Sequence, residues 1–333
     1  MKPKAIIDNH GRPVNYLRLA VTDRCNLRCF YCMPEEGIHY LPKKELLTYE
    51  EMLRLCQILA SLGINKVRIT GGEPFVRKDL LYFLKNLRKI KGIDKISLTT
   101  NGVLTYDYIP DLVELGISMV NLSLDTLDAE NFLRITRRNE FEKVMQTFYA
   151  LVESGISTKI NTVVMDGKNT EDLIPLAQLT EKHPVSVRFI EEMPFNGEGN
   201  HYATLKWSHH KILDTLRQAY PNLQKLPVPA HSTATLYQVP GFQGNIGIIA
   251  AFSRTFCGTC NRIRITAQGL LKTCLYDEGV LDLKQVMRSG ANDQRLEETL
   301  IHAFRHRAKD GFEAEKQRQS NHPVKESMST IGG

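Results

Sequence analysis

Short β-rich segments recur through the first part of the chain, with amphipathic segments of helical periodicity between them. The β-rich segments are residues 14–21, 66–70, 95–100, 119–125, 158–165 and 185–193, and the helical segments are about 48–62, 78–91, 107–115, 139–154 and 170–182. Strands that alternate with helices form βαβ units around a parallel sheet, which indicates an α/β protein. Because six units are too few to close an eight-stranded barrel, we predict a partial, open-sided (β/α)6 barrel of the TIM type.

The predicted strands carry polar side chains at alternate positions, whereas parallel strands covered by helices are usually continuous apolar runs. Neighbouring side chains of a strand point to opposite faces, so the polar residues of each strand share one face. An exposed antiparallel sheet would show the same alternation, but it conflicts with the intervening helices. We therefore expect a polar, cation-bearing wall inside the barrel, formed by Arg18, by Lys66, Arg68 and Thr70, by Ser97, Thr99 and Asn101, by Asn121, Ser123 and Asp125, and by Lys159 and Asn161.

The second part of the chain has a different pattern. After a predicted helix at 207–219, residues 221–235 contain three prolines and read as a linker. Short β-rich segments follow at 236–239, 245–250, 261–266 and 270–275, with helices at about 280–289 and 293–307. We predict a barrel over residues 1–220, a smaller C-terminal α+β region over 236–310 that closes the barrel opening, and a polar tail over 311–333.

Six of the seven cysteines form two triplets, Cys25, Cys29 and Cys32 near the start and Cys257, Cys260 and Cys274 near the end. A four-iron cluster has four corners, so three cysteines leave one iron open to coordinate another molecule. At the first triplet this iron could chelate the amino and carboxylate groups of an amino acid. Zinc sites that lack a fourth ligand, or unrelated core cysteines, are the alternatives. The seventh, Cys56, lies on the apolar face of a predicted helix and reads as a core thiol.

Composition narrows the class of protein. Hydrophobic residues make up 42% and charged residues 24% of the 333 residues, as in globular enzymes. We see no secretory signal and no membrane-spanning run, and the tight cysteine spacing favours metal binding in a reducing cytoplasm. The net charge of +6 suits a polyanionic small molecule, and it could also suit nucleic acid.

Several motifs identify a family. The Cys25-x3-Cys29-x2-Cys32 spacing with Tyr31 before the last cysteine, and the Gly-Gly-Glu-Pro segment at 71–74, resemble the radical S-adenosylmethionine superfamily. Residues 188–194, 256–266 and 270–275 and the final Gly332-Gly333 resemble the GTP 3′,8-cyclase family, and this resemblance runs essentially end to end. It implies the first step of molybdenum cofactor biosynthesis, conversion of GTP to 3′,8-cyclo-7,8-dihydro-GTP through abstraction of the ribose 3′ hydrogen by a 5′-deoxyadenosyl radical.

The resemblance also implies cofactors, partners and residue roles. The cofactors are two [4Fe-4S] clusters on the two triplets, of which the second holds the guanine, and S-adenosylmethionine on the first. A reductant protein and a homodimer are expected, without membrane or nucleic-acid partners. Gly332 and Gly333 are expected to reach toward the active site. The S-adenosylmethionine residues are Tyr31, Gly72, Ser123 and Met193, and the GTP residues are Arg18, Lys66, Arg68, Thr99, Lys159, Arg188, Arg262, Ile263 and Arg264.

Two other functions stay open at this point. One is another radical enzyme with an auxiliary cluster, such as a peptide-modifying enzyme; the other is a nonenzymatic protein that binds zinc and nucleic acid. The sequence contains no Gly-x4-Gly-Lys-Ser/Thr phosphate loop and no GxGxxG after a strand, so a nucleotide would be bound by scattered cations. His302 and His306 lack the glutamate of a metalloprotease helix, and with His209 and His210 they read as surface residues.

Overall fold

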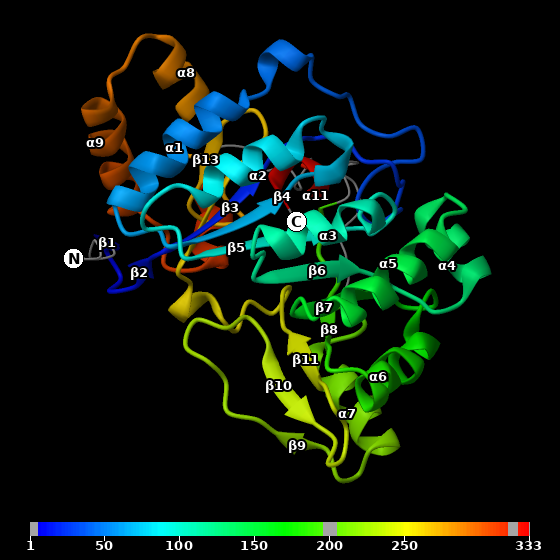
Figure 1. The fold of residues 1–333 in the computed structure, drawn as a ribbon. Coiled ribbons are helices and arrows are strands. Elements are labelled where there is room, and N and C mark those ends of the chain that lie inside the picture. Colours follow the sequence, from blue (N-terminus) through cyan, green and yellow to red (C-terminus); the bar gives the residue numbers. More distant parts are fainter. Residues whose placement is uncertain (1–5, 196–204, 319–325, 333) are drawn as a thin grey trace.

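The computed structural model describes residues 6–195, 205–318 and 326–332. Its main element is a 12-stranded sheet in which six parallel strands follow one another in chain order (Figure 1). These strands are β3 (Tyr16–Ala20), β4 (Lys66–Thr70), β5 (Lys95–Thr100), β6 (Met119–Ser123), β7 (Thr158–Val164) and β8 (Ser186–Glu191). The sheet ends in two edges, β14 and β9, so the predicted open-sided α/β barrel is confirmed.

Helices follow the barrel strands and lie on their outer side (Figure 1). The first begins at Thr48, whose hydroxyl accepts from the backbone of Glu51 while the Glu51 carboxylate accepts from the Thr48 backbone, a capping box that stabilises the helix start. The helices are α1 (Tyr49–Ser61), α2 (Leu80–Arg88), α3 (Ile109–Glu114), α4 (Ala129–Thr136), α5 (Phe141–Glu153) and α6 (Leu173–Lys182).

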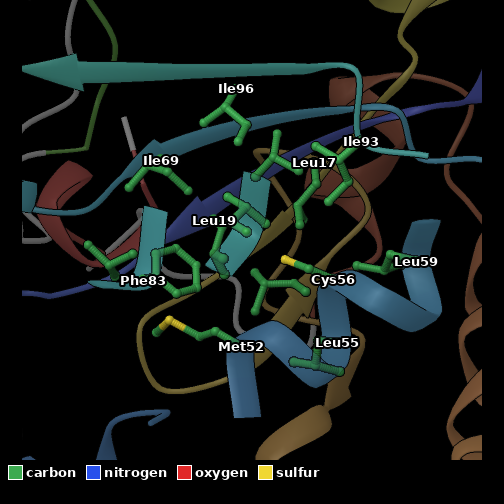
Figure 2. Close-up of a cluster of buried hydrophobic side chains, with 14 of the residues drawn as sticks. Leu17, Leu19, Met52, Leu55, Cys56, Leu59, Ile69, Phe83, Ile93 and Ile96 are labelled. Carbon is green, nitrogen blue, oxygen red and sulfur yellow. The ribbon is translucent and has the colours of Figure 1, made fainter. Parts of the chain in front are cut away.

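The hydrophobic core lies between these helices and the outer face of the sheet. Figure 2 shows Met52, Leu55 and Cys56 of α1 beside Leu17 and Leu19 of β3. Cys56 is 1% exposed, and the prediction that it is a core thiol is confirmed. Because the apolar side chains of each strand occupy this outer face, the alternate polar ones must face the interior of the barrel.

The C-terminal region adds strands to both edges of the barrel sheet. β11 pairs in parallel with β8, and β12 pairs in parallel with β3. The strands of this region are β9 (Gln224–Lys225), β10 (Thr235–Gln238), β11 (Asn245–Ile249), β12 (Arg262–Ile265), β13 (Leu270–Lys272) and β14 (Leu281–Asp282). Its helices are α7 (His209–Ala219), α8 (Leu283–Arg288), α9 (Asp293–Phe304), α10 (Gly311–Lys316) and α11 (Met328–Ile331), and a hairpin of β1 (Ile6–Ile7) and β2 (Pro13–Val14) precedes the barrel.

Several short helices and strands lie where the sequence analysis predicts none, among them β1, α4, β9, α10 and α11. β1 and β9 span two residues each and α10 and α11 span six and four, which is too short for a hydrophobic period to be visible. Two of the helices nevertheless have a readable start, because Asp128 accepts a hydrogen bond from the Asn131 backbone and Asp310 accepts from the backbones of Phe312 and Glu313. An aspartate in this position is a common N-terminal cap and would have revealed both helices.

Candidate active site

The interior of the barrel holds a cavity of about 710 Å³. All six cysteines of the two triplets line it, as do four residues predicted for S-adenosylmethionine and eight of the nine predicted for GTP. The exception is Ile263, whose side chain is fully buried in the hydrophobic core on the other face of β12. The structure therefore brings together residues that the chain separates by more than 200 positions. The lining includes Tyr31, Gly72, Ser123, Met193, Arg18, Lys66, Arg68, Thr99, Lys159, Arg188, Arg262 and Arg264.

The first triplet occupies the loop after β3. The backbone N–H groups of Cys32 and Met33 both donate to the Cys29 carbonyl, at 2.9 and 3.1 Å, and this turn folds the loop back on itself. The Asn101 amide lies 3.6 Å from the Cys25 sulfur and can donate to it. Burial raises the pKa of the Cys25 thiol to about 12, and the negative charge of Glu73 adds to the rise. These thiols need a bound metal to stabilise their thiolate form.

The Gly-Gly-Glu-Pro segment packs directly against this loop. Gly72 donates to the Thr22 carbonyl at 2.9 Å, and a Cβ at Gly72 would lie 2.2 Å from the Arg24 carbonyl oxygen. Only glycine permits so close an approach of two backbones. The backbone edge at Gly72 consequently faces the cavity beside the cysteines.

Glu73 of the same segment is a site residue that the sequence analysis missed. Its side chain is fully buried and accepts hydrogen bonds from the Asn101 backbone at 2.7 Å and from the Thr100 hydroxyl at 2.9 Å. Burial raises the pKa of this carboxyl to about 7. Glu73 thereby ties the end of β5 to the loop after β4 and holds Asn101 near Cys25.

Tyr31 is fixed from the opposite side of the loop. Its hydroxyl donates to Asp125 at 2.7 Å, and the other carboxylate oxygen of Asp125 accepts from the Val163 backbone at 2.8 Å. Burial raises the pKa of Asp125 to about 6. Tyr31, the aromatic residue before Cys32, is thus held by Asp125, which follows β6 and is itself bound to Val163 of β7; no local pattern in the chain predicts this contact.

The cationic side chains form rows across neighbouring strands. Arg264 of β12, Arg18 of β3 and Arg68 of β4 are aligned in register, and Asn121 of β6 is aligned with Lys159 of β7. Burial lowers the pKa of Arg18 to about 10. Burial together with Arg188, Arg68 and Lys66 lowers the pKa of Lys159 to about 7. The close cations therefore repel one another in the state that the structure shows.

Among the described residues, these cations have no carboxylate partner. Within residues 6–195, 205–318 and 326–332, no ion pair involves Arg18, Lys66, Arg68, Lys159, Arg188, Arg262 or Arg264. Buried polar atoms without a hydrogen-bond partner also line the cavity, among them Nε of Arg18, Nε of Arg188 and Oγ1 of Thr99. Buried charges are normally paired, so this wall matches a ligand that carries several negative charges.

The second triplet comes from two loops. Cys257 and Cys260 lie at the short 3₁₀ helix Cys257–Thr259, and Cys274 follows β13. The Asp277 carboxylate accepts from the Thr273 and Cys274 backbones, both at 2.8 Å, and shapes the second loop. Burial alone would raise the pKa of Cys260, but Arg262 and Arg307 lower it to about 7. Two guanidinium groups therefore stabilise the thiolate form of Cys260.

The C-terminal segment enters the same region (Figure 1). The Arg264 guanidinium donates to the Gly332 carbonyl, and the Ser327 hydroxyl donates to the Cys32 carbonyl at 2.6 Å. Gly332 has φ +75°, and a Cβ there would lie 2.6 Å from Thr70 Oγ1. Gly332 therefore contacts Arg264 and lies close to Thr70, two residues that line the cavity, while Gly333 lies outside the described residues.

The donor sets fit the implied clusters in type and arrangement. None of the seven cysteines is in a disulfide. The charges of Cys25 and Cys32 raise the pKa of Cys29, and the charges of Cys260 and Cys257 raise the pKa of Cys274. The three thiols of each triplet are therefore close in space. In the described part of the chain no three His, Cys, Asp or Glu side chains converge on one metal ion. A four-iron cluster offers each cysteine a separate iron, so its ligands need not converge.

No helix in the described ranges is long and apolar enough to cross a membrane.

Residues 19–180 match the Radical SAM superfamily, and residues 185–312 match the Molybdenum Cofactor Synthesis C family. The fold also resembles that of SuiB from Streptococcus suis bound to S-adenosylmethionine, with a TM-score of 0.59 and 15% identity over 86% of this chain and 69% of that one. Fold and site together define a radical S-adenosylmethionine protein with a second cysteine triplet in its C-terminal region.

Sequence relatives identify the family within this superfamily. The chain is 42% identical to a GTP 3′,8-cyclase of Desulforamulus reducens, over 91% of this chain and 94% of the relative. It is 45% identical to human molybdenum cofactor biosynthesis protein 1, over 87% of this chain and 46% of the relative, so it spans about half the length of that protein. The chain belongs to the GTP 3′,8-cyclase family.

Proposed function

We propose that this chain is a lyase that converts GTP to 3′,8-cyclo-7,8-dihydro-GTP, the first step of molybdenum cofactor biosynthesis. The observation that carries the proposal is that one cavity is lined by both cysteine triplets and by cations that form no ion pair with any carboxylate among the described residues. The triplets supply two places for an iron–sulfur cluster with an open iron. The cations supply a place for a triphosphate, which is the most highly charged part of GTP.

The first triplet and its supporting residues would bind a [4Fe-4S] cluster and S-adenosylmethionine. Cys25, Cys29 and Cys32 would hold three irons, and the backbone edge at Gly72 would face the amino acid part of the bound molecule. Tyr31, Ser123 and Met193 line the same cavity and would pack around this molecule. When reduced, the cluster supplies the electron that cleaves S-adenosylmethionine and so provides the radical for removal of the ribose 3′ hydrogen.

The remaining residues would bind and orient GTP. Cys257, Cys260 and Cys274 would hold the other cluster, which would supply an open iron to bind the guanine. Arginine forms two parallel hydrogen bonds to a phosphate and lysine acts as a point charge, so Arg18, Arg68, Arg188 and the two lysines suit the triphosphate. Arg262 and Arg264 flank the buried Ile263 and extend this set toward the second triplet. Their part of the work is to fix the ribose relative to the first triplet and exclude water.

The proposal also covers the cellular compartment, the electron donor and the oligomeric state of the protein. Seven unpaired cysteines suit a reducing cytoplasm, and a reductant protein must deliver electrons to the first cluster. A homodimer is part of the proposal, and size-exclusion chromatography with light scattering would test it.

The direct test uses anaerobically reconstituted protein with S-adenosylmethionine and a strong reductant, with and without GTP. Mass spectrometry would measure 5′-deoxyadenosine and any isomer of GTP. We expect GTP-dependent 5′-deoxyadenosine together with a new species of the mass of GTP. Formation of 5′-deoxyadenosine that GTP does not affect would favour another substrate, such as a peptide. No 5′-deoxyadenosine from protein that carries both clusters would refute the proposal.

A further inference from the structure

A buried ion network lies against the second cysteine triplet and has no role in the function proposed above. Its centre is Asp8, in the turn of the β1–β2 hairpin, whose side chain is fully buried. One oxygen of this carboxylate accepts from Arg12 Nε at 2.7 Å and from Arg307 at 3.0 Å. The side chains of Arg12 and Arg307 are 6% and 2% exposed. The three residues carry a net single positive charge in the interior.

The two arginines hydrogen-bond to the chain at or beside every cysteine of the triplet. Arg12 donates to the Cys257 carbonyl at 3.2 Å. Arg307 donates to the Cys260 carbonyl at 3.4 Å and to the carbonyl of Thr273, directly before Cys274, at 3.0 Å. Cys260 and Cys274 lie on separate loops, so Arg307 sets the spacing between two of the three ligands.

Arg307 also reaches a ligand atom. Its Nη2 lies 3.8 Å from the Cys260 sulfur, within range of a hydrogen bond to sulfur. A guanidinium is a planar group with several N–H donors, so it can serve the carbonyls and the sulfur together. The first triplet has a weaker counterpart, the neutral amide of Asn101 at 3.6 Å from Cys25.

A cationic donor at a ligand sulfur affects a cluster in two ways. It orients the cysteine, and it favours the reduced cluster, which carries one more negative charge than the oxidised one. We propose that Arg307, held by Asp8, is a positioning residue that retains the second cluster and raises its reduction potential. The inference rests on the proposed function, because it requires a cluster at the second triplet.

The test uses the full chain, reconstituted anaerobically, with iron and sulfide content and an EPR-monitored redox titration as readouts. The second cluster is the one whose signal does not change when S-adenosylmethionine is added. Mutation of a residue that hydrogen-bonds to a metal ligand typically changes metal affinity or activity by about 10–100-fold. For R307Q we expect the reduced-to-oxidised ratio of the second cluster to fall about tenfold at a fixed potential, or about 59 mV for a one-electron couple.

Three further variants separate this role from general folding. R305Q removes the same charge at an exposed position two residues away, and we expect this variant to have the iron content and the reduction potentials of wild type. R307K keeps the charge but cannot reach all the acceptors, so the reduction potential of its second cluster should lie between the values for wild type and R307Q. D8N should shift the potential in the same direction as R307Q, because it releases the arginine.

The outcomes are distinguishable. Loss of the second cluster alone, or a lowered potential of that cluster alone, supports the role of Arg307. Wild-type iron content and potential in R307Q refute it while leaving the proposed function intact. If R307Q binds neither cluster, R307K decides the question. A lowered reduction potential of the second cluster in R307K supports the role. An unchanged potential of that cluster, or the loss of both clusters, refutes it. A wild-type protein without a second cluster refutes the inference and the proposed function together.

Discussion

Lys159 should take up a proton when the cavity binds GTP. Burial and the nearby Arg188, Arg68 and Lys66 lower its pKa to about 7, so the free protein holds this lysine largely neutral at pH 8. A bound triphosphate neutralises the arginines and attracts the protonated lysine, which returns the pKa of Lys159 toward its ordinary range. Tyr16 titrates nearby: burial would raise its pKa, but Arg68, Arg18 and Lys66 lower it to about 8, and this shift is also reversed by a polyanion.

The size of the effect follows from these two pKa values. At pH 8 the neutral lysine would take up roughly 0.9 proton and the ionised tyrosine roughly 0.5 proton when both return to their ordinary ranges. Because binding favours the protonated lysine, GTP affinity is greatest below pH 7 and falls as the pH rises through the pKa of the free protein. From pH 7 to pH 9 Lys159 alone should weaken binding by roughly 50-fold.

Isothermal titration calorimetry measures this uptake directly. GTP is titrated into the reconstituted protein at pH 8 in HEPES and in Tris, whose ionisation enthalpies differ, and the difference in heat gives the number of protons. K159R is the matched control, since it keeps the charge and cannot titrate; its uptake should fall by roughly 0.9 proton and its affinity should depend much less on pH. Equal heats in both buffers for wild type, or unchanged uptake in K159R, would refute the reasoning.

Three further substitutions test other parts of the structure. G72A places a Cβ 2.2 Å from the Arg24 carbonyl oxygen, so the first cysteine loop must shift and iron content should fall by about half; unchanged iron would contradict this packing argument. C56A should lower the free energy of unfolding by about 1 kcal/mol in a denaturant titration and leave iron content unchanged, because Cys56 is a core thiol. G332A, at φ +75° and 2.6 Å from Thr70 Oγ1, should reduce turnover on the order of 100-fold with both clusters intact, and wild-type turnover would exclude a role for the tail.

The amino-acid sequence alone determined the features that depend only on residues close together in the chain, namely most of the strands, most of the helices and the cysteine motifs. The alternation of apolar and polar residues in strands such as 66–70 defines two faces, because strand side chains alternate, and it predicted the cationic wall. The helix at 48–62 followed from its period and placed Cys56 in the core. The six cluster cysteines stood out because their spacing is a chemical requirement of the ligand, independent of the fold around it.

Tertiary structure decided which of these groups meet and which stay unpaired. Arg12 and Arg18 lie six residues apart, yet Arg12 pairs with Asp8, whereas Arg18 lines the cavity and has no carboxylate partner in the described part of the chain. Glu73 and Arg307 were equally hidden, because their partners lie on other strands or, for Asp8 and Arg307, 299 residues apart. Such contacts arise when distant segments pack together, and no periodicity of the chain records them.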